Sequence, residues 1–195
     1  MREVHPALRN LYSERKRKPK ELWISNIVFC QRFEFLNYVF GSSSKITDST
    51  LAGIYLHTLI QSYLEKNGYE IEKRVEIDIG DKWKLIGRVD AVKDVVIEIK
   101  TTNNYHDVKD YWIAQANIYA YILNRPKFEI LVIDKITGCY STYRFKTDNN
   151  LAKKTIAAAI NVKNCIIKNK PPTGRMDSCV DFCEFGHLCK HVVEL

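Results

Sequence analysis

Residues 87–102 read GRVDAVKDVVIEIKTT, and this stretch decides the fold prediction. Val and Ile dominate it, and a short polar interruption in its middle predicts a hairpin turn between two strands. A strand pair of this composition belongs in a core, yet it carries Asp90, Glu98 and Lys100. Buried charges are costly unless they are paired or bound to a metal. The hairpin therefore predicts a polar site set in an apolar frame.

The side chains of a strand alternate between two faces, so Glu98 and Lys100 point one way and the flanking isoleucines point the other. If the turn has an odd number of residues centred on Asp94, Asp90 lies directly across from Glu98. Carboxyl groups that close repel each other unless a cation lies between them. Mg²⁺ and Mn²⁺ suit such oxygen ligands and complete their shells with water and phosphate oxygens. The alternative is a pair of surface charges on an edge hairpin.

The chain has 195 residues, of which 46% are apolar, and this predicts one domain over residues 1–195. No apolar run approaches the ~20 residues of a membrane span, and the charged N-terminus lacks the apolar part of a signal peptide. We therefore expect a cytoplasmic protein without a membrane partner. The formal net charge of +7 favours a polyanionic partner. The basic run at 14–20 is either a solvated arm or a nucleic-acid contact.

Apolar periodicity and turn residues predict the elements along the chain. We expect a helix over Trp23–Tyr38 with Ser25 as its N-cap. The other expected helices cover 47–66, which we predict to be largely buried, 107–124 and 150–170, and the expected strands cover 70–79, 82–92, 95–101, 127–134 and 139–145. This order predicts a mixed α/β domain with a central sheet covered by helices.

Four short segments, taken together, resemble a known family. GRVDAV (87–92) followed by IEIK (97–100) resembles the GxxD…ExK core of the RecB-like nucleases, a branch of the PD-(D/E)xK superfamily. GIYLH (53–57) is similar to the helical GxxxH element of that branch, and QANIY (115–119) is similar to its QxxxY helix. Read singly, each has a plain alternative, a core histidine or an ordinary amphipathic helix face.

The resemblance implies a restriction-endonuclease-like core and a role for each matching residue. His57, Asp90, Glu98 and the backbone carbonyl of Ile99 are implied as ligands of Mn²⁺ or Mg²⁺. Lys100 is implied to handle the attacking water. Gln115 and Tyr119 lie one helical turn apart and share a face, so they either address the DNA backbone or brace Lys100.

The cysteines suggest a second metal centre, because in a reducing compartment a cluster of thiols is expected to bind metal rather than to form disulfides. CVDFCEFGHLC, in the C-terminal segment 171–195, supplies Cys179, Cys183 and Cys189. The fourth ligand of a tetrahedral site is either a histidine, His187 or His191, which indicates structural zinc, or Cys30 in the segment 23–40.

The arrangement with Cys30 resembles the CRISPR-associated exonucleases of the RecB-like type. The resemblance implies a 4Fe-4S cluster held by Cys30, Cys179, Cys183 and Cys189, which joins the N- and C-terminal segments. Two features depart from that family, namely Gln31 where proline is usual and three residues between the first two C-terminal cysteines where two are common.

The same resemblance implies a single-stranded DNA exonuclease in CRISPR spacer acquisition, working from the 5′ end and, in some members of the family, also as an endonuclease. Its implied partners are DNA, mainly single-stranded or with free ends, and the adaptation integrase. The alternatives are a non-catalytic DNA-binding iron-sulfur or zinc protein, a transcriptional or redox sensor, and a RecB-like nuclease of DNA repair or of a viral genome.

Overall fold

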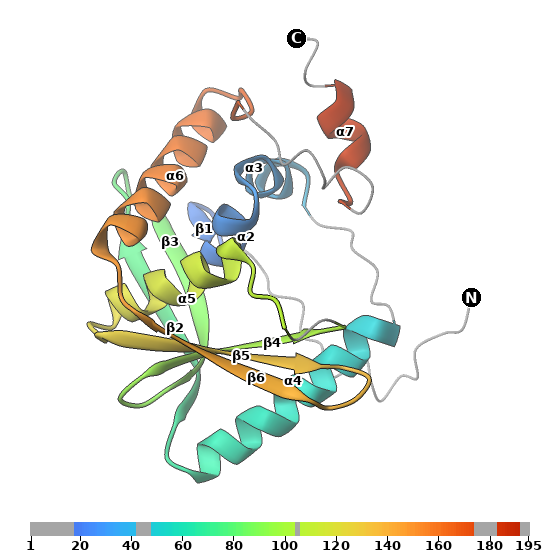
Figure 1. Cartoon of the computed structure of the whole chain (residues 1–195). Helices are drawn as coiled ribbons and strands as arrows, with labels where there is room; N and C mark the ends of the chain where they lie inside the picture. Colours follow the sequence, from blue (N-terminus) through green and yellow to red (C-terminus); the bar gives the residue numbers. More distant parts are fainter. Residues whose placement is uncertain (1–17, 42–47, 104–105, 174–182, 192–195) are drawn as a thin grey trace.

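The structure is a computed structural model, and it describes residues 18–41, 48–103, 106–173 and 183–191. Its centre is a mixed sheet of six strands, in the order β1-β3-β4-β5-β6 with β2 paired to β3 (Figure 1). The strands are β1 Glu21–Trp23, β2 Glu70–Asp78, β3 Lys84–Val92, β4 Val96–Thr102, β5 Lys127–Asp134 and β6 Tyr140–Lys146. The predicted strands are confirmed to within one residue at each end, except that β3 starts two residues later, and β1 was not predicted.

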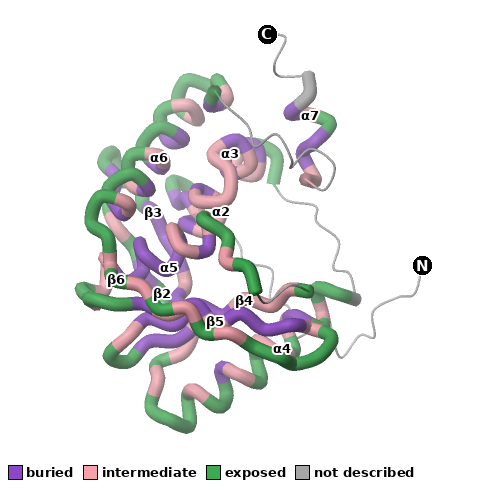
Figure 2. The backbone as a smooth tube through the Cα atoms, in the orientation of Figure 1, coloured by how far each residue is buried: buried purple, intermediate pink, exposed green. Residues whose placement is uncertain are grey.

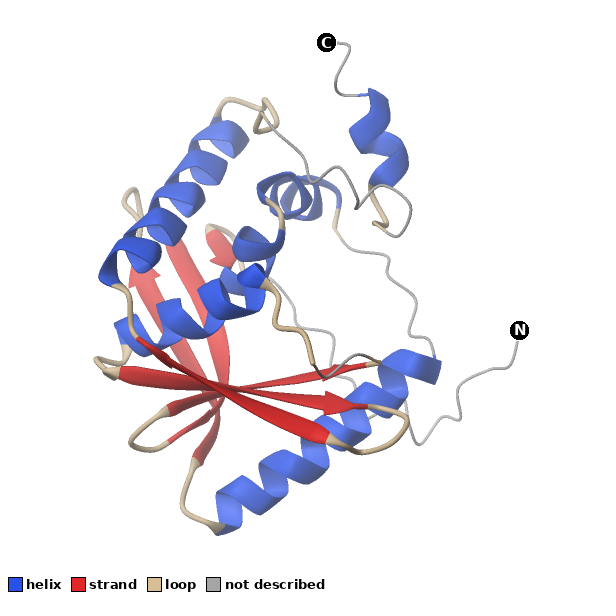
Figure 3. Ribbon diagram, viewed as in Figure 1, coloured by secondary structure: helices blue, strands red, loops and turns tan. Residues whose placement is uncertain are grey.

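Helices cover both faces of the sheet (Figure 3). They are α2 Ile24–Phe29, α3 Gln31–Phe40, α4 Asp48–Lys66, α5 Asp110–Ile122, α6 Asn149–Ile167 and α7 Gly186–His191. A large core lies among α2, α3, α5, α6 and the sheet, and a smaller one lies between α4 and β4 (Figure 2). None of the helices in the described part of the chain has both the length and the apolar character needed to cross a membrane.

The hairpin of β3 and β4 has the predicted register. Val92 pairs with Val96 and Ala91 pairs with Ile97, so the turn has three residues with Asp94 at its centre. One step further along, Asp90 lies across from Glu98. The prediction of two acids facing each other on neighbouring strands is confirmed.

One edge of β3 is divided between two partners. β1 runs parallel to residues 84–86, whereas β4 pairs with residues 91–92. β2 runs antiparallel along the whole of the other edge. Residues 87–90 therefore face the opening where β1 and β4 diverge.

The helix predicted over Trp23–Tyr38 is wrong in two respects. Cys30 has extended backbone angles, φ −162° and ψ 120°, and separates α2 from α3. Ser25 lies inside α2, whose N-cap is Trp23. The two short helices fold against each other at this break, because the buried Glu34 carboxylate of α3 accepts hydrogen bonds from the Trp23 amide (2.8 Å) and from Asn26 Nδ2 (2.7 Å) at the start of α2.

The prediction that the helix over 47–66 is largely buried is also wrong. α4 packs only one face, with Ile60 and Leu64, against the smaller core. Tyr55, Leu59 and Tyr63 lie on its outer face and are exposed. The helix covers a sheet from one side only, and this leaves half of its apolar positions without a layer to cover them.

A glycine in β3 sets how closely α5 packs. A Cβ atom at Gly87 would lie 2.4 Å from Cε1 of Tyr119 and 3.0 Å from Cδ1 of Ile24. We expect Gly87→Ala to lower the free energy of unfolding by about 1–3 kcal/mol, because a well-packed core does not absorb an added methyl group. Urea unfolding measures this loss. Adding Tyr119→Ala should recover part of it in a double-mutant cycle, and purely additive losses would contradict the clash.

Candidate active site and metal centre

The site residues predicted from the sequence converge on one pocket of about 240 Å³ at the opening between β1 and β4. The pocket is lined by His57, Asp90, Glu98, Ile99, Lys100, Gln115 and Tyr119, together with Trp23, Ser25 and Arg88. These residues come from α2, α4 and α5 as well as from three strands. The fold thus assembles in space a set that spans more than ninety residues of sequence.

Asp90 joins β3, β4 and α4 at the centre of the pocket. Its Oδ2 accepts a hydrogen bond from the Ile99 amide at 2.7 Å and lies 3.2 Å from His57 Nε2. Burial lowers the pKa of His57, but the hydrogen bond and the charge of Asp90 outweigh this, so the pKa lies above its ordinary value. The imidazole of His57 and the carboxylate of Asp90 therefore attract each other at the place where the sequence predicts the metal ligands.

Gly53 allows α4 to come close enough for His57 to reach this position. A Cβ atom at Gly53 would lie 2.8 Å from Thr101 Oγ1 on β4. Gly53 and His57 are one helical turn apart and so lie on the same face of α4. The GxxxH pattern thus has a geometric reason, since the glycine permits the approach and the histidine uses it.

Glu98 is the most deeply buried acid of the pocket, with 1% of its surface exposed. Oε1 lies 2.7 Å from Lys100 Nζ, whereas Oε2 has no hydrogen-bond partner among the described residues. Burial, reinforced by the charge of Asp90, raises the pKa of Glu98 to about 7. An unpartnered buried carboxylate oxygen beside a second carboxylate is what a bound dication satisfies, so the residues present suit a hard divalent metal.

Gln115 and Tyr119 form a buried brace behind Lys100. Lys100 Nζ donates to Gln115 Oε1 at 2.9 Å, and Gln115 Nε2 donates to the Tyr119 hydroxyl at 3.3 Å. Tyr119 is 2% exposed, and burial raises the pKa of its hydroxyl above the ordinary value. Of the two roles that the QxxxY pattern leaves open, the geometry favours bracing Lys100 over contacting the DNA backbone.

Glu72 is a functional candidate that sequence reasoning missed. It lies across from Asp90 in the register of β2 and β3, and ligand atoms of His57, Glu72 and Asp90 lie within 4.8 Å of one another. Its carboxylate accepts hydrogen bonds from Gln61 Nε2 (2.7 Å) and Arg88 Nη1 (3.1 Å). Its φ of 52° lies in the left-handed region, which is rare for a residue inside a strand. The signal in the sequence is the pairing of these two strands. Counting back from Asp90 through the turn between β2 and β3 leads to Glu72 as the residue opposite Asp90.

The raised pKa of Glu98 makes metal binding depend on pH. Below pH 7 the proton on Glu98 competes with the cation, so we expect the affinity for Mn²⁺ to fall by about tenfold for each further pH unit. Isothermal titration calorimetry at pH 6, 7 and 8 measures this. Glu98→Gln should bind Mn²⁺ more weakly and with a shallower slope, because His57, whose pKa is also raised, still competes for a proton. An equally steep slope in that variant would assign the lost proton to another group.

Three of the predicted cysteines, Cys30, Cys183 and Cys189, influence one another electrostatically, but among the described residues they do not form a group with all ligand atoms within 4.8 Å of one another. Burial raises the pKa of the Cys183 thiol, and the charges of Cys189 and Cys30 raise it further. Phe185, two residues after Cys183, packs edge-on against Phe33 of α3 with ring centroids 5.5 Å apart. Cys179 lies outside the described residues. His187, one of the two histidines of the zinc alternative, is exposed.

Comparisons with known proteins place this geometry in context. No protein-family model matches the sequence, and no curated protein gives a significant match. Solved structures do match. SSO0001 superposes with a TM-score of 0.73 at 23% identity, over 93% of this chain and 91% of that one. LHK-Exo, an alkaline exonuclease from Laribacter hongkongensis solved in complex with dAMP, has a TM-score of 0.59 at 14% identity, over 76% and 88% of the two chains.

A phage-related exonuclease from Haemophilus somnus 129PT matches more distantly, with a TM-score of 0.50 and 13% identity over 71% of this chain and 81% of that one. The chain therefore has the mixed α/β fold of these exonucleases, a central mixed sheet flanked by helices. Asp90, Glu98 and Lys100 lie on the central hairpin of this fold. The mixed α/β class with a central sheet flanked by helices is confirmed, whereas the PD-(D/E)xK assignment and the iron-sulfur linkage stay predictions.

Proposed function

We propose that the chain is a metal-dependent deoxyribonuclease that hydrolyses phosphodiester bonds at the ends of single-stranded DNA. The observation that carries the proposal is the unpartnered, buried Oε2 of Glu98 beside Asp90, with an amine held next to it. The exonuclease fold supports the proposal, as does the dAMP in LHK-Exo, which is a DNA mononucleotide. The net charge of +7 supports a polyanionic substrate.

Asp90, Glu98, His57 and the carbonyl of Ile99 would hold Mn²⁺ or Mg²⁺. When bound, such a dication supplies Lewis-acid polarisation of the scissile phosphate and makes water easier to deprotonate. Glu72 lies within reach of the same set and is held by Gln61 and Arg88, so it either joins the ligands or orients them.

Lys100 supplies the acid-base and electrostatic part of the chemistry. Its ammonium group is fixed between Glu98 and Gln115, at 2.7 and 2.9 Å, so it keeps one position without reorganisation during the reaction. From there it orients the attacking water or donates a hydrogen bond to the charge that develops on the phosphate. Tyr119 secures Gln115 from the core side.

The finer parts of the proposal come from the resemblance to CRISPR-associated RecB-like exonucleases. They are a 5′ to 3′ direction, additional endonuclease activity, and a role in preparing DNA fragments for spacer acquisition with the adaptation integrase. A nuclease of DNA repair or of a viral genome would use the same residues in the same roles.

Digestion of end-labelled single-stranded DNA tests the function. With Mn²⁺ present, a 5′ label should appear in the smallest products from the earliest time points, while the 3′-labelled strand shortens progressively. EDTA should stop the reaction. Folded protein that binds the strand but does not cut it with either Mn²⁺ or Mg²⁺ would refute the nuclease and favour the non-catalytic DNA-binding alternative.

We also propose the 4Fe-4S cluster on Cys30, Cys179, Cys183 and Cys189, which the resemblance to CRISPR-associated RecB-like exonucleases implies. Protein purified anaerobically should be brown and contain about four iron atoms per chain. Cys183→Ala should lose the iron, whereas Cys139→Ala, at an exposed cysteine on the far hairpin, should keep it. Colourless protein with one zinc ion per chain would replace the cluster with a structural zinc site.

A further inference from the structure

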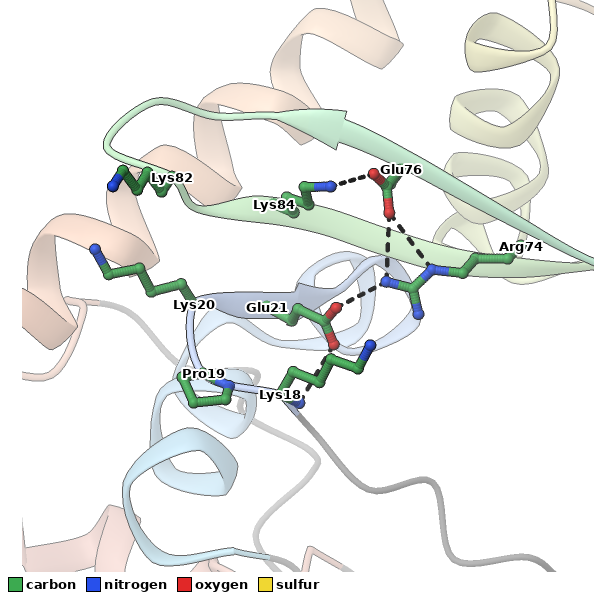
Figure 4. A pocket seen from close by; sticks show the side chains of 8 residues that line it. All are labelled: Lys18, Pro19, Lys20, Glu21, Arg74, Glu76, Lys82 and Lys84. Carbon is green, nitrogen blue, oxygen red and sulfur yellow. Dashed lines mark hydrogen bonds and ion pairs between the residues drawn. The ribbon is translucent and has the colours of Figure 1, made fainter.

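A second pocket, of about 450 Å³, lies at the other end of β3 from Asp90 (Figure 4). It is lined by the start of the described chain, β1, β2 and the turn that leads into β3. Four lysines, one arginine and two glutamates line it, which leaves three positive charges in excess. We call this the basic pocket.

The two carboxylates of the basic pocket are already engaged within it. Glu21 binds Arg74 at 2.7 Å, and Glu76 binds both Arg74 and Lys84. Arg74 and Lys84 are therefore neutralised by their neighbours.

The other three cations of the pocket, Lys18, Lys20 and Lys82, are not paired with either of its two carboxylates. Lys18 and Lys82 make no ion pair within the described part of the chain, and Lys20 donates to the backbone carbonyl of Asp81 at 3.2 Å. The Asp81 carboxylate itself binds Lys163 at 2.9 Å. Figure 4 shows Lys20 and Lys82 apart from the network of Arg74, whereas the backbone amide of Lys18 donates to Glu21 of that network at 3.3 Å. Three ammonium groups gathered at one hollow repel one another unless an anion joins them.

The basic pocket and the active site open on the same face of the sheet. Side chains alternate along β3, so Lys84, Arg88 and Asp90 share one face. Lys84 lines the basic pocket, whereas Arg88 and Asp90 line the active-site pocket. β1 repeats this division, because Glu21 lines the basic pocket and Trp23 lines the active site. The six residue steps from Lys84 to Asp90 span about 20 Å.

We propose that the basic pocket binds the phosphate backbone of the same DNA strand whose end lies in the active site. This inference rests on the proposed function and adds to it a second contact. Lysines recognise phosphate as point charges, so the contact strengthens binding without reading sequence.

The separation of the two pockets sets a minimum length of strand. About 20 Å corresponds to about six nucleotides at the 3.4 Å rise of a duplex strand, and to fewer when the strand is extended. A trinucleotide in the active site stays short of the basic pocket in a stacked conformation, whereas an oligonucleotide of about twelve reaches it. Loss of the pocket's cations should therefore weaken binding of the longer strand only.

The double variant Lys18→Gln with Lys82→Gln tests the proposal, and Lys153→Gln with Lys154→Gln, at exposed positions of α6, is the control with the same change in net charge. Fluorescence anisotropy in EDTA measures binding without any cleavage. For a dodecanucleotide we expect about a tenfold weaker affinity in the first variant. The slope of its logarithm against salt should be smaller by about 1.4, the value for two phosphate contacts on a single strand. The control variant and the trinucleotide should show neither change.

Equal weakening in both double variants would overturn the proposal, because net charge rather than the pocket would then carry the effect. No change in the first variant, or equal weakening for the trinucleotide, would overturn it as well. Failure of the nuclease function is a separate result, since it appears as absent cleavage in the metal-containing assay while the binding measurement needs neither metal nor cleavage.

Discussion

Replacing Lys100 with alanine is expected to lower the rate of DNA cleavage by about 10²–10⁴-fold, the usual range for loss of a positioned acid-base group. Lys100 is held by Glu98 and Gln115, and no second amine lines the active-site pocket among the described residues. Single-turnover digestion of labelled single-stranded DNA measures the rate. Calorimetry at pH 8 should still detect Mn²⁺ binding, because Asp90 and Glu98 remain.

Lys93→Ala is the matched control for this variant. Lys93 lies in the turn of the same hairpin and is exposed, and its ammonium group donates to the backbone carbonyl of Asn67 at 3.2 Å and lies over the ring of Tyr69. Its replacement should leave cleavage within about twofold of the starting rate, as is usual for surface changes. Cleavage by Lys100→Ala at the rate of this control would remove the lysine from the mechanism.

Asp90→Asn is expected to abolish the stabilisation that Mn²⁺ gives to the folded chain, and with it the cleavage. A ligand at one hundred times its dissociation constant stabilises a protein by about 2.7 kcal/mol, which appears as a rise in melting temperature. The amide side chain of this variant keeps an oxygen able to accept the hydrogen bond that Asp90 Oδ2 receives from the Ile99 amide, so the hairpin should stay folded. Thermal melts with and without Mn²⁺ separate the lost metal from a lost fold.

Asp94→Asn serves as the control, because Asp94 is the exposed centre of the turn and its replacement changes the net charge by the same amount. It should keep the full rise in melting temperature with Mn²⁺. If Asp90→Asn also keeps that rise, the metal lies elsewhere, and the group of His57, Glu72 and Asp90 loses its assigned role.

The sequence predicts the central hairpin well because its information is local. The alternation of Val and Ile, the three-residue turn and the positions of Asp90 and Glu98 all lie within a few residues of one another. The resemblance of the short motifs to a known family adds His57, Gln115 and Tyr119 to the predicted site, and the structure places them in one pocket. The QxxxY spacing shows that two side chains share a face, but only tertiary packing shows that this face is buried.

The features that the sequence does not reveal depend on contacts between distant segments. The break at Cys30 accompanies hydrogen bonds from the start of α2 to the Glu34 carboxylate of α3. Helix propensities carry no information on such a contact. Glu72 lies in a strand of mixed charges, and only the pairing of β2 with β3 brings it to Asp90. The exposed face of α4 follows from the absence of a further layer over it in the described chain.

The shared edge of β3 links folding to catalytic competence. β1 and α2 supply Trp23 and Ser25 to a pocket whose acids arise more than sixty residues later in the chain. The wall of the pocket is thus completed only when the early segment docks beside a strand that is synthesised much later. A newly made or partly unfolded chain therefore lacks a finished active site, which would confine the proposed nuclease activity to molecules that have reached their native state.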